Sequence, residues 1–420
     1  MVLVLVEEIT NRLTYTFDFI FKSRGITYEL TTRRDIFNDS SFKKLNYSTL
    51  ETREKQIVPS DLLNQNEIVR QVLGVENYLN EPTLSFNGAL DPIASVFYVL
   101  TRYEEYIEGD RDVHNRFPFT ESILKKYNWI EKAKCDRWAR LIVHFIGEEV
   151  EEERVEIIPT FDIDNTFAYQ LKKGKQKNLS ILKDIVNLNF NRLLERKRVL
   201  KGEIDPYNTF EIIKKTAKRF PNTKVFWLVG GRSKKDRNIP ISNKDHQDLV
   251  QEMNDAVSVN LHPSYASNSN SDLILEEKKA LEKVLGHSVN NSRQHFLRFK
   301  LPETFQAILD VGFTSEYSMG FAESLGFRSG TARKHFWFDL SKNKVTKLTI
   351  HPFVYMDGTL NEYMKLTVEE SKGKIEELYK EVQEFGGDFV FLWHNETIGN
   401  YGKWKGWSEV LEFTLNLDNE

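Results

Sequence analysis

The sequence has little of what would place it in several specialised classes of protein. Its single cysteine, Cys135, cannot form a disulfide within the chain. No apolar stretch reaches the roughly 18 residues that a membrane-spanning helix needs. The apolar run at residues 2–6 has no basic leader and is too short for a signal peptide. These absences predict a cytoplasmic protein without a membrane span.

The chain also lacks a large excess of positive or negative charge. The chain has 58 Lys and Arg against 62 Asp and Glu, a net charge of −4, with both signs interspersed. This balance gives no overall attraction to nucleic acid or to an anionic membrane, and we expect no nucleic-acid partner. Local basic runs occur at residues 172–175 and 196–198. We interpret these runs as solvated faces of helices or loops.

The length of 420 residues predicts two domains. In the first 150 residues, strands are predicted at 2–6 and 28–31, with a helix between them that Thr10 can cap. Residues 90–107 and 129–146 predict helices whose aromatic faces pack in a core. The charged run at 147–154 predicts a boundary between a small α/β domain at 1–150 and a second domain at 155–420.

Strand and helix patterns alternate after residue 155. We predict strands at 155–161, 224–229, 256–261, 291–296 and 388–393, and a weaker one at 345–350. Helical patterns fall between them, at 206–219, 244–254, 272–285, 302–311 and 366–385. This α/β alternation predicts a parallel sheet, either open or closed into a barrel. In such sheets the chemistry takes place at the carboxyl ends of the strands.

Acids and histidines recur at these predicted strand ends. They are Asp162, Asp164, His262, His295 and His394. Taken singly, each has a structural explanation: a histidine at a strand end is usually hydrogen-bonded, and an aspartate often caps a turn. Their recurrence at four strand ends favours one shared cleft instead. Carboxylates together with imidazoles supply both metal ligands and acid–base groups.

The order of these residues resembles a known family. The run Thr160-Phe161-Asp162-Ile163-Asp164, then His262, then Arg293, then Leu392-Trp393-His394-Asn395, is similar to the polysaccharide deacetylases, or NodB homology domains. The resemblance covers roughly residues 155–420 and includes connecting segments at 205–210, 312–316 and 326–331. These segments look like a bacterial branch of that family, in which a domain of unknown function precedes the barrel. Residues 91–106 look like part of that domain.

The resemblance implies a distorted (β/α) barrel that binds a divalent metal, most often zinc. It implies that Asp162 is the general base, that Arg293 orients this base, and that His394 is the general acid. It also implies that Asp164 and His262 are metal ligands. The implied reaction is hydrolytic removal of acetyl groups from N-acetylated sugars in a glycan or a glycan precursor.

One metal ligand departs from the family pattern. The family usually has a second histidine four residues after the first, where this chain has Ala266. If His262 aligned with that second histidine, Ser258 would take the first place. We predict that His295 is the replacement ligand. If His295 does not reach the metal, binding is weak or the domain is inactive. Glu316 stands where the family commonly has an aspartate.

Two other functions stay open. An apolar strand followed by Asp162-x-Asp164-x-Thr166 also begins haloacid-dehalogenase-type phosphatases, in which the first aspartate is a nucleophile and the metal is magnesium. That family needs a later acidic pair, and the last strand ends on His394 and Asn395 instead. The missing histidine also allows a glycan-binding protein without activity. Retention of Asp162, Arg293 and His394 argues against a pure binder.

Four aromatic side chains lie near the predicted strand ends: Tyr265, Phe296, Trp337 and Trp393. Each can pack in a core or stack on a sugar ring. We expect sugar contact for Tyr265 and Trp393. The sequence leaves open which sugar is bound, whether the acetyl group is on nitrogen or oxygen, and the oligomeric state.

Overall fold

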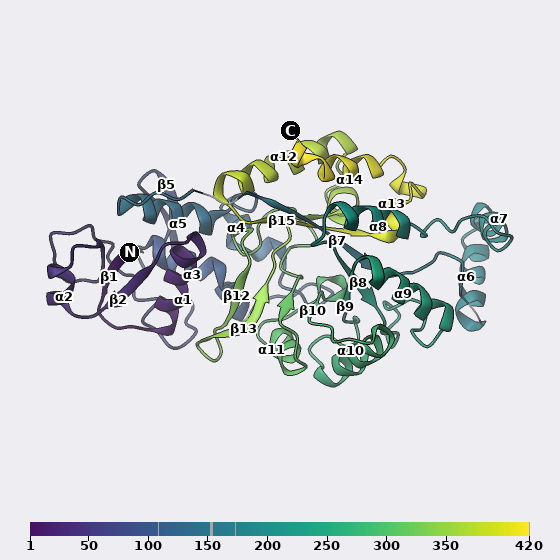
Figure 1. The fold of residues 1–420 in the computed structure, drawn as a ribbon, viewed down its shortest axis with the longest axis horizontal. Helices are drawn as coiled ribbons and strands as arrows, with labels where there is room; N and C mark the ends of the chain where they lie inside the picture. The colour runs from purple at the N-terminus through teal and green to yellow at the C-terminus, as the bar shows by residue number, and fades with distance from the viewer. Residues whose placement is uncertain (108, 152–153, 173, 420) are drawn as a thin grey trace.

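The computed structural model describes residues 1–107, 109–151, 154–172 and 174–419, and has a mixed α/β fold (Figure 1). At the N-terminus, β1 (Val2–Val6) lies at the centre of a parallel sheet, between β2 (Tyr28–Thr31) and β3 (Lys43–Tyr47). Helix α1 (Asn11–Ile20) begins after Thr10, whose side chain accepts a hydrogen bond from the Leu13 N–H. The strands predicted at 2–6 and 28–31 and the Thr10 cap are therefore confirmed.

This region also contains a second small sheet, the short helices α2 (Arg34–Asp39) and α4 (Ile123–Lys126), and two longer helices. The antiparallel strands are β4 (Leu73–Tyr78), β5 (Glu81–Phe86) and β6 (Ala89–Leu90), and they lie beside α3 (Pro92–Leu100) and α5 (Lys134–Phe145). Both helices are shorter than predicted. Helix α3 ends before Arg102, which has a left-handed backbone with φ of 55°. The core of this region also contains Phe321, Phe338 and Leu340, so it packs directly on the rest of the chain.

The large sheet has nine strands, in the order β12-β13-β11-β10-β9-β8-β7-β15-β14. The strands are β7 (Glu156–Ile163), β8 (Lys224–Leu228), β9 (Ser258–His262), β10 (Asn291–Ser292), β11 (Ser315–Glu316), β12 (His335–Asp339), β13 (Lys344–Ile350), β14 (Tyr355–Met356) and β15 (Asp388–His394). All neighbours pair in parallel except β12 and β13. The carboxyl ends of the parallel strands therefore lie on one side of the sheet.

The sheet is strongly curved. Along β7, Ile157, Phe161 and Ile163 join the core that faces the helices, whereas Ile158 joins a separate cluster on the other face. In that cluster the rings of Phe226, on β8, and Tyr317, next to β11, are 5.2 Å apart. Three strand spacings of about 4.8 Å would separate these strands in a flat sheet. The sheet thus curls toward a barrel, whose closure remains a prediction because β12 and β14 do not pair among the described residues.

Helices cover the outer face of this sheet. They include α8 (Phe210–Arg219), α9 (Lys244–Ala256), α10 (Ser271–Leu285), α11 (Glu303–Asp310) and α12 (Val368–Phe385), which confirm the five predicted helical segments with shifted ends. Helices α6 (Gly174–Val186) and α7 (Phe190–Val199) were not predicted. They form a hairpin that protrudes at the end of the molecule opposite the N-terminal region (Figure 1). No described helix is both long and apolar enough to cross a bilayer.

A buried histidine on α9 predicts loss of stability in acid. The Nε2 of His246 lies 2.9 Å from Nε1 of Trp227, which can only donate, so His246 must accept there and stay neutral. Burial lowers the pKa of His246 to about 4, from an ordinary value of about 6.5. The unfolded chain therefore binds a proton that the folded chain does not, and the stability contributed by this residue is lost as pH falls from 6.5 toward 4.

We expect this residue alone to lower the free energy of unfolding by about 2 kcal/mol between pH 7 and pH 5. Urea unfolding of the wild type and of His246→Gln at both pH values measures the effect, because glutamine can accept from Trp227 but does not titrate. The difference between the two pH values should be smaller in the variant by that amount. An equal difference in both proteins would show that His246 is not the group that titrates.

Candidate active site and metal centre

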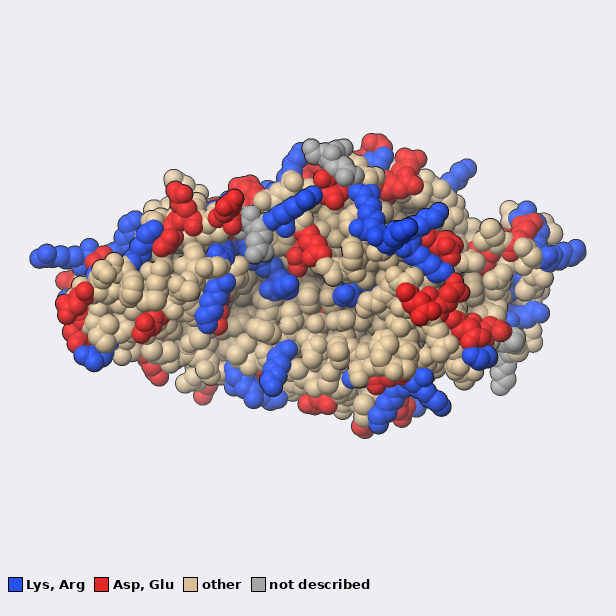
Figure 2. All heavy atoms as spheres, viewed as in Figure 1, with Lys and Arg blue, Asp and Glu red and all other residues tan. Residues whose placement is uncertain are grey.

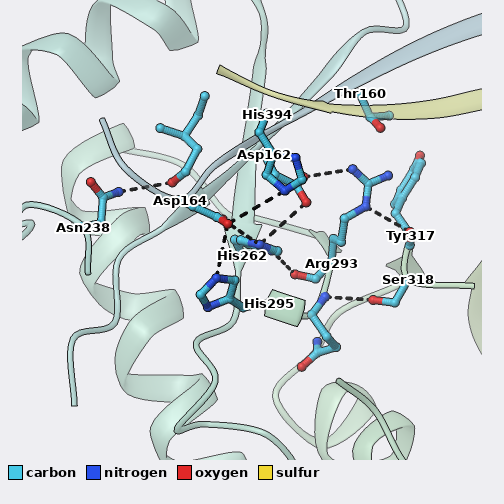
Figure 3. A network of polar contacts seen from close by, with 12 residues as sticks. Thr160, Asp162, Asp164, Asn238, His262, Arg293, His295, Tyr317, Ser318 and His394 are labelled. Atoms are coloured by element: carbon cyan, nitrogen blue, oxygen red, sulfur yellow. Dashed lines mark hydrogen bonds and ion pairs between the residues drawn. The ribbon is translucent and has the colours of Figure 1, made fainter. Parts of the chain in front are cut away.

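Polar side chains from separate strands meet in one cleft at the carboxyl side of the large sheet. The cleft has a volume of about 200 Å³. Its lining includes Asp162 and Asp164 from the end of β7, His262 from β9, His295 after β10, and His394 from β15 (Figure 3). The convergence of strand ends that we predicted from the sequence is therefore present.

Asp164, His262 and His295 form a possible three-residue metal site. One ligand atom from each lies within 4.8 Å of the others. The Oδ1 of Asp164 is 3.2 Å from Nε2 of His262, and its Oδ2 is 3.3 Å from Nε2 of His295. Figure 3 shows both imidazoles turned toward the Asp164 carboxylate. The Asp164 Oδ1 is buried and accepts no hydrogen bond within the protein, as expected of an oxygen that faces a cation.

The Nδ1 atoms of His262 and His295, which face away from Asp164, each have a hydrogen-bond partner. The Nδ1 of His262 contacts the backbone carbonyl of Arg293, so it carries the proton and leaves the Nε2 lone pair facing Asp164. The Nδ1 of His295 lies 2.9 Å from Oδ1 of Asp236, which also accepts the Tyr265 N–H at 2.7 Å. Metal-binding histidines are typically oriented by such carbonyl and carboxylate partners. The donor set and its outer contacts therefore fit a divalent cation.

His295 reaches the cluster because the chain leaves the sheet early. The strand predicted at 291–296 is wrong beyond Ser292, and residues 295–297 form a 3₁₀ turn. Within it Phe296 has a left-handed φ of 63°, a rare conformation for a bulky residue. Ser258 begins β9, at the opposite end of that strand from His262. The alternative alignment through Ser258 therefore supplies no ligand.

Charge is concentrated in this cluster. Burial disfavours the ionised form of Asp164, but the adjacent His295 and His262 outweigh burial and hold the pKa of Asp164 well below its usual range. Burial also opposes protonation of His295, but Asp164 and Asp236 raise the pKa of His295 to about 9. A cation bound here would replace the proton on the Nε2 of His295.

Asp162 lies beside this cluster and is held by Arg293. The Nη1 of Arg293 donates to Oδ1 of Asp162 at 2.9 Å, and its Nε donates to the carbonyl of Tyr317 at 3.0 Å. The Oδ2 of Asp162 is 3.6 Å from Nε2 of His262. Arg293 is fully buried, and its guanidinium lies 4.5 Å from the Phe226 ring centre. One carboxylate oxygen is thus fixed, while the other faces the cluster.

Glu316 occupies a neighbouring buried position. Its carboxylate accepts hydrogen bonds from the hydroxyls of Ser292 and Ser318, and the structure gives it no direct hydrogen bond to Arg293. Burial raises the pKa of Glu316 to about 7. Glu316, in β11, therefore ties Ser292, at the end of β10, to Ser318, and Ser292 directly precedes Arg293.

His394 is paired with an aspartate that sequence reasoning missed. Its Nδ1 lies 2.8 Å from Oδ1 of Asp357, and Asp357 also accepts the His394 N–H at 2.8 Å. The Nε2 of His394 points toward Asp164, 3.8 Å from Oδ2. Burial opposes protonation, but Asp357, with smaller contributions from Asp164 and Asp162, raises the pKa of His394 well above its usual value. The contact with Asp357 therefore favours the protonated form of His394.

The aromatic side chains that line the cleft are not the two that we expected to contact sugar. Trp393 is fully buried in the core facing the helices, so its predicted contact with sugar is wrong. Tyr265 packs edge-on against Phe296 and His114 and does not line the cleft. The aromatic side chains that line it are Phe296, Tyr363 and Trp404.

A buried glutamine and an arginine from the N-terminal region also line the cleft. Gln294 is buried, and both atoms of its side-chain amide lack a hydrogen-bond partner. Arg116 donates to Glu323 at 2.9 Å and to the carbonyl of Phe296 at 3.0 Å. Residues before position 150 therefore help to build the rim of the cleft.

The fold and the cleft define a mixed α/β protein with a possible three-residue metal site beside Asp162 and His394. Residues 2–151 match the model of a family of unknown function, DUF7033. The search of curated proteins gave no match.

Solved structures give distant matches. A putative polysaccharide deacetylase from Mycobacterium smegmatis is 12% identical with a TM-score of 0.40, and the match covers 64% of this chain and 88% of that one. A polysaccharide deacetylase from Bacillus cereus is 11% identical with a TM-score of 0.30, covering 63% and 88%. The Puue allantoinase is 14% identical with a TM-score of 0.38, covering 61% and 83%. At these TM-scores the likeness carries no functional conclusion for this chain.

Proposed function

We propose that this protein is a metal-dependent hydrolase that removes acetyl groups from N-acetylated sugars of a glycan or a glycan precursor. The observation that carries the proposal is the arrangement of three parts. A cluster fit for a cation, Asp164 with two histidines, lies beside both Asp162, held by Arg293, and His394, held by Asp357. Amide hydrolysis needs a polarising group, a base and an acid within reach of the scissile bond.

Asp164, His262 and His295 would hold the cation. Two imidazoles and one carboxylate suit zinc, whereas magnesium prefers oxygen ligands, and this preference counts against the phosphatase alternative. Three protein ligands leave coordination positions open for water and substrate. When bound, the cation would acidify a water molecule and polarise the acetyl carbonyl.

Asp162 would accept the proton of the attacking water on Oδ2, the oxygen that Arg293 does not hold. His394 would donate its Nε2 proton to the nitrogen that leaves the acetyl group. Asp357 favours the protonated form of this imidazole and fixes its orientation. A protein that only binds glycans would need neither the Asp162–Arg293 pair nor the His394–Asp357 pair.

Gln294 favours an N-acetyl over an O-acetyl substrate. A buried polar group without a hydrogen-bond partner lowers the stability of the fold by about 1–3 kcal/mol. The two unpaired amide atoms of Gln294 therefore indicate that a ligand binds there. The N–H of an acetamide can donate to Oε1 of Gln294, while the carbonyl oxygen, on the opposite side of the trans amide, stays free for the cation. An acetate ester has no N–H to offer.

The test is a substrate panel for the zinc-loaded protein, made up of N-acetylated oligosaccharides, O-acetylated oligosaccharides, and a phosphomonoester supplied with magnesium. We expect equal amounts of acetate and free amine from the N-acetylated sugars, with activity lost on chelation and restored by zinc. Gln294→Leu should lower kcat/KM for the N-acetyl substrate by about tenfold and leave that for the ester nearly unchanged. Phosphate release without acetate, or glycan binding without acetate, would contradict the proposal.

A further inference from the structure

Large exposed apolar side chains are concentrated on the α6–α7 hairpin. Eight of the twenty-two such residues in the described part of the chain lie between positions 182 and 204. They are Leu182, Ile185, Val186, Leu188, Phe190, Leu194, Leu200 and Ile204. Val186 and Leu188, at the turn of the hairpin, are 71% and 72% exposed. Such a concentration of exposed apolar side chains in one segment indicates an interaction site.

Polar contacts attach this hairpin to the rest of the protein. Arg196 bonds Asp184 at 2.9 Å across the two helices, and its guanidinium lies 4.8 Å from the ring centre of Tyr169. The Tyr169 hydroxyl donates to Glu195 at 2.6 Å. Val199 is the only buried apolar side chain that the structure describes between residues 174 and 204. Because helices in proteins are stabilised mainly by packing of an apolar face, this hairpin lacks the partner for that face.

The same segment is strongly basic. Residues 172–204 hold ten Lys and Arg against three Asp and Glu, a local net charge of +7 in a chain whose net charge is −4. The end of the molecule formed by α6 and α7 carries several blue side chains around tan surface in Figure 2. These basic residues include the runs at 172–175 and 196–198 that we interpreted from the sequence as solvated faces.

We propose that the α6–α7 hairpin docks the protein on an anionic lipid bilayer. Its apolar side chains would enter the interface between headgroups and acyl chains, and its Lys and Arg would contact the anionic headgroups. The charge selects this occupant over a second copy of the chain, because two hairpins of net charge +7 would repel each other. Each basic residue near such a surface strengthens binding by about fivefold.

A cavity connects this hairpin with the wall of the active site. It has a volume of about 960 Å³ and is lined by Ser180, Lys183 and Arg192 of the hairpin. Its lining also includes Asn165, next to Asp164, and Asp236, which orients His295. If the proposed deacetylase function holds, this placement selects amino-sugar glycans that are carried on a lipid in the bilayer.

Sedimentation with lipid vesicles tests the docking. The full-length protein is mixed with phosphatidylcholine vesicles with or without about 30% phosphatidylglycerol, at low and high salt. We expect binding to the anionic vesicles only, weakened by salt, and reduced at least tenfold in the double variant Leu188→Glu/Phe190→Glu. Val72→Glu is the matched control, because Val72 is 73% exposed and lies outside the hairpin. This control should bind like the wild type.

Two further measurements make the outcome decisive. Asp164→Asn, which alters the metal cluster, should bind vesicles normally, so failure of the deacetylase proposal and failure of docking are distinguishable. Absence of binding to anionic vesicles overturns the docking proposal. A dimer in analytical ultracentrifugation that Leu188→Glu/Phe190→Glu dissociates also overturns it, because a second copy would then cover the apolar face.

Discussion

Replacing Asp162 with asparagine should lower kcat for deacetylation by about 10²–10⁴-fold, the usual contribution of a positioned general base. Asparagine has the same shape and can still accept from Arg293, but it cannot take a proton at neutral pH. Zinc content should be unchanged, because Asp162 lies outside the cluster of Asp164, His262 and His295. Acetate release under saturating substrate measures the rate, and elemental analysis measures the zinc.

The control is Asp255→Asn, the same chemical change at an exposed position near the end of α9, which should leave kcat unchanged. If Asp162→Asn keeps its zinc and works within about threefold of the wild-type rate, another group must be the base, since loss of a general base costs about 10²-fold or more. If it loses its zinc, Asp162 belongs among the ligands instead.

The largest effect on stability is expected for Glu105→Leu. Glu105 is buried between two arginines, accepting from Nε of Arg102 at 2.7 Å and from Nη2 of Arg328 at 2.7 Å. Removal of one member of a buried ionic cluster typically costs about 3–5 kcal/mol, because the remaining charges stay buried. Since Arg328 follows the predicted boundary and Glu105 precedes it, the loss would also loosen contact between the two parts of the chain.

Urea unfolding of the purified variant measures this effect. Glu54→Leu serves as the matched control, because Glu54 makes a surface pair with Lys44 at 3.4 Å and its loss should change the free energy of unfolding by less than about 1 kcal/mol. Equal stability of the two variants would mean that the buried cluster contributes nothing beyond an ordinary surface pair.

The strand ends could be predicted because their signals are local. Apolar runs such as the one ending at Asp162, and the one ending at His394, are each followed at once by polar residues. Parallel pairing then brings these ends together without further information. The bounds of β1 and β2 and the presence of the main helices followed for the same reason, from runs, caps and helical periodicity.

The partners of the histidines could not be predicted this way. Asp236 lies in a loop, 59 residues before His295, and Asp357 follows a strand of only two residues. No periodic pattern marks either position. The turn that brings His295 to the cluster was also missed. Residues 291–295 are all polar, so no alternation marks where the strand stops, and the backbone leaves the sheet at Arg293.

The α6–α7 hairpin was missed for a different reason. Its apolar residues do not face a core within the chain, so their positions follow no pattern set by internal packing. The bilayer proposed above would supply the missing partner.

Metal content after purification tests the central claim most directly. The account predicts about one zinc ion per chain in the wild type, and loss of this zinc in both His262→Ala and His295→Ala, because each removes one of only three ligands. Zinc that survives His295→Ala would remove His295 from the proposed ligands and leave the rest of the site in place. A wild-type protein that binds no transition metal, even when zinc is supplied, would contradict the account.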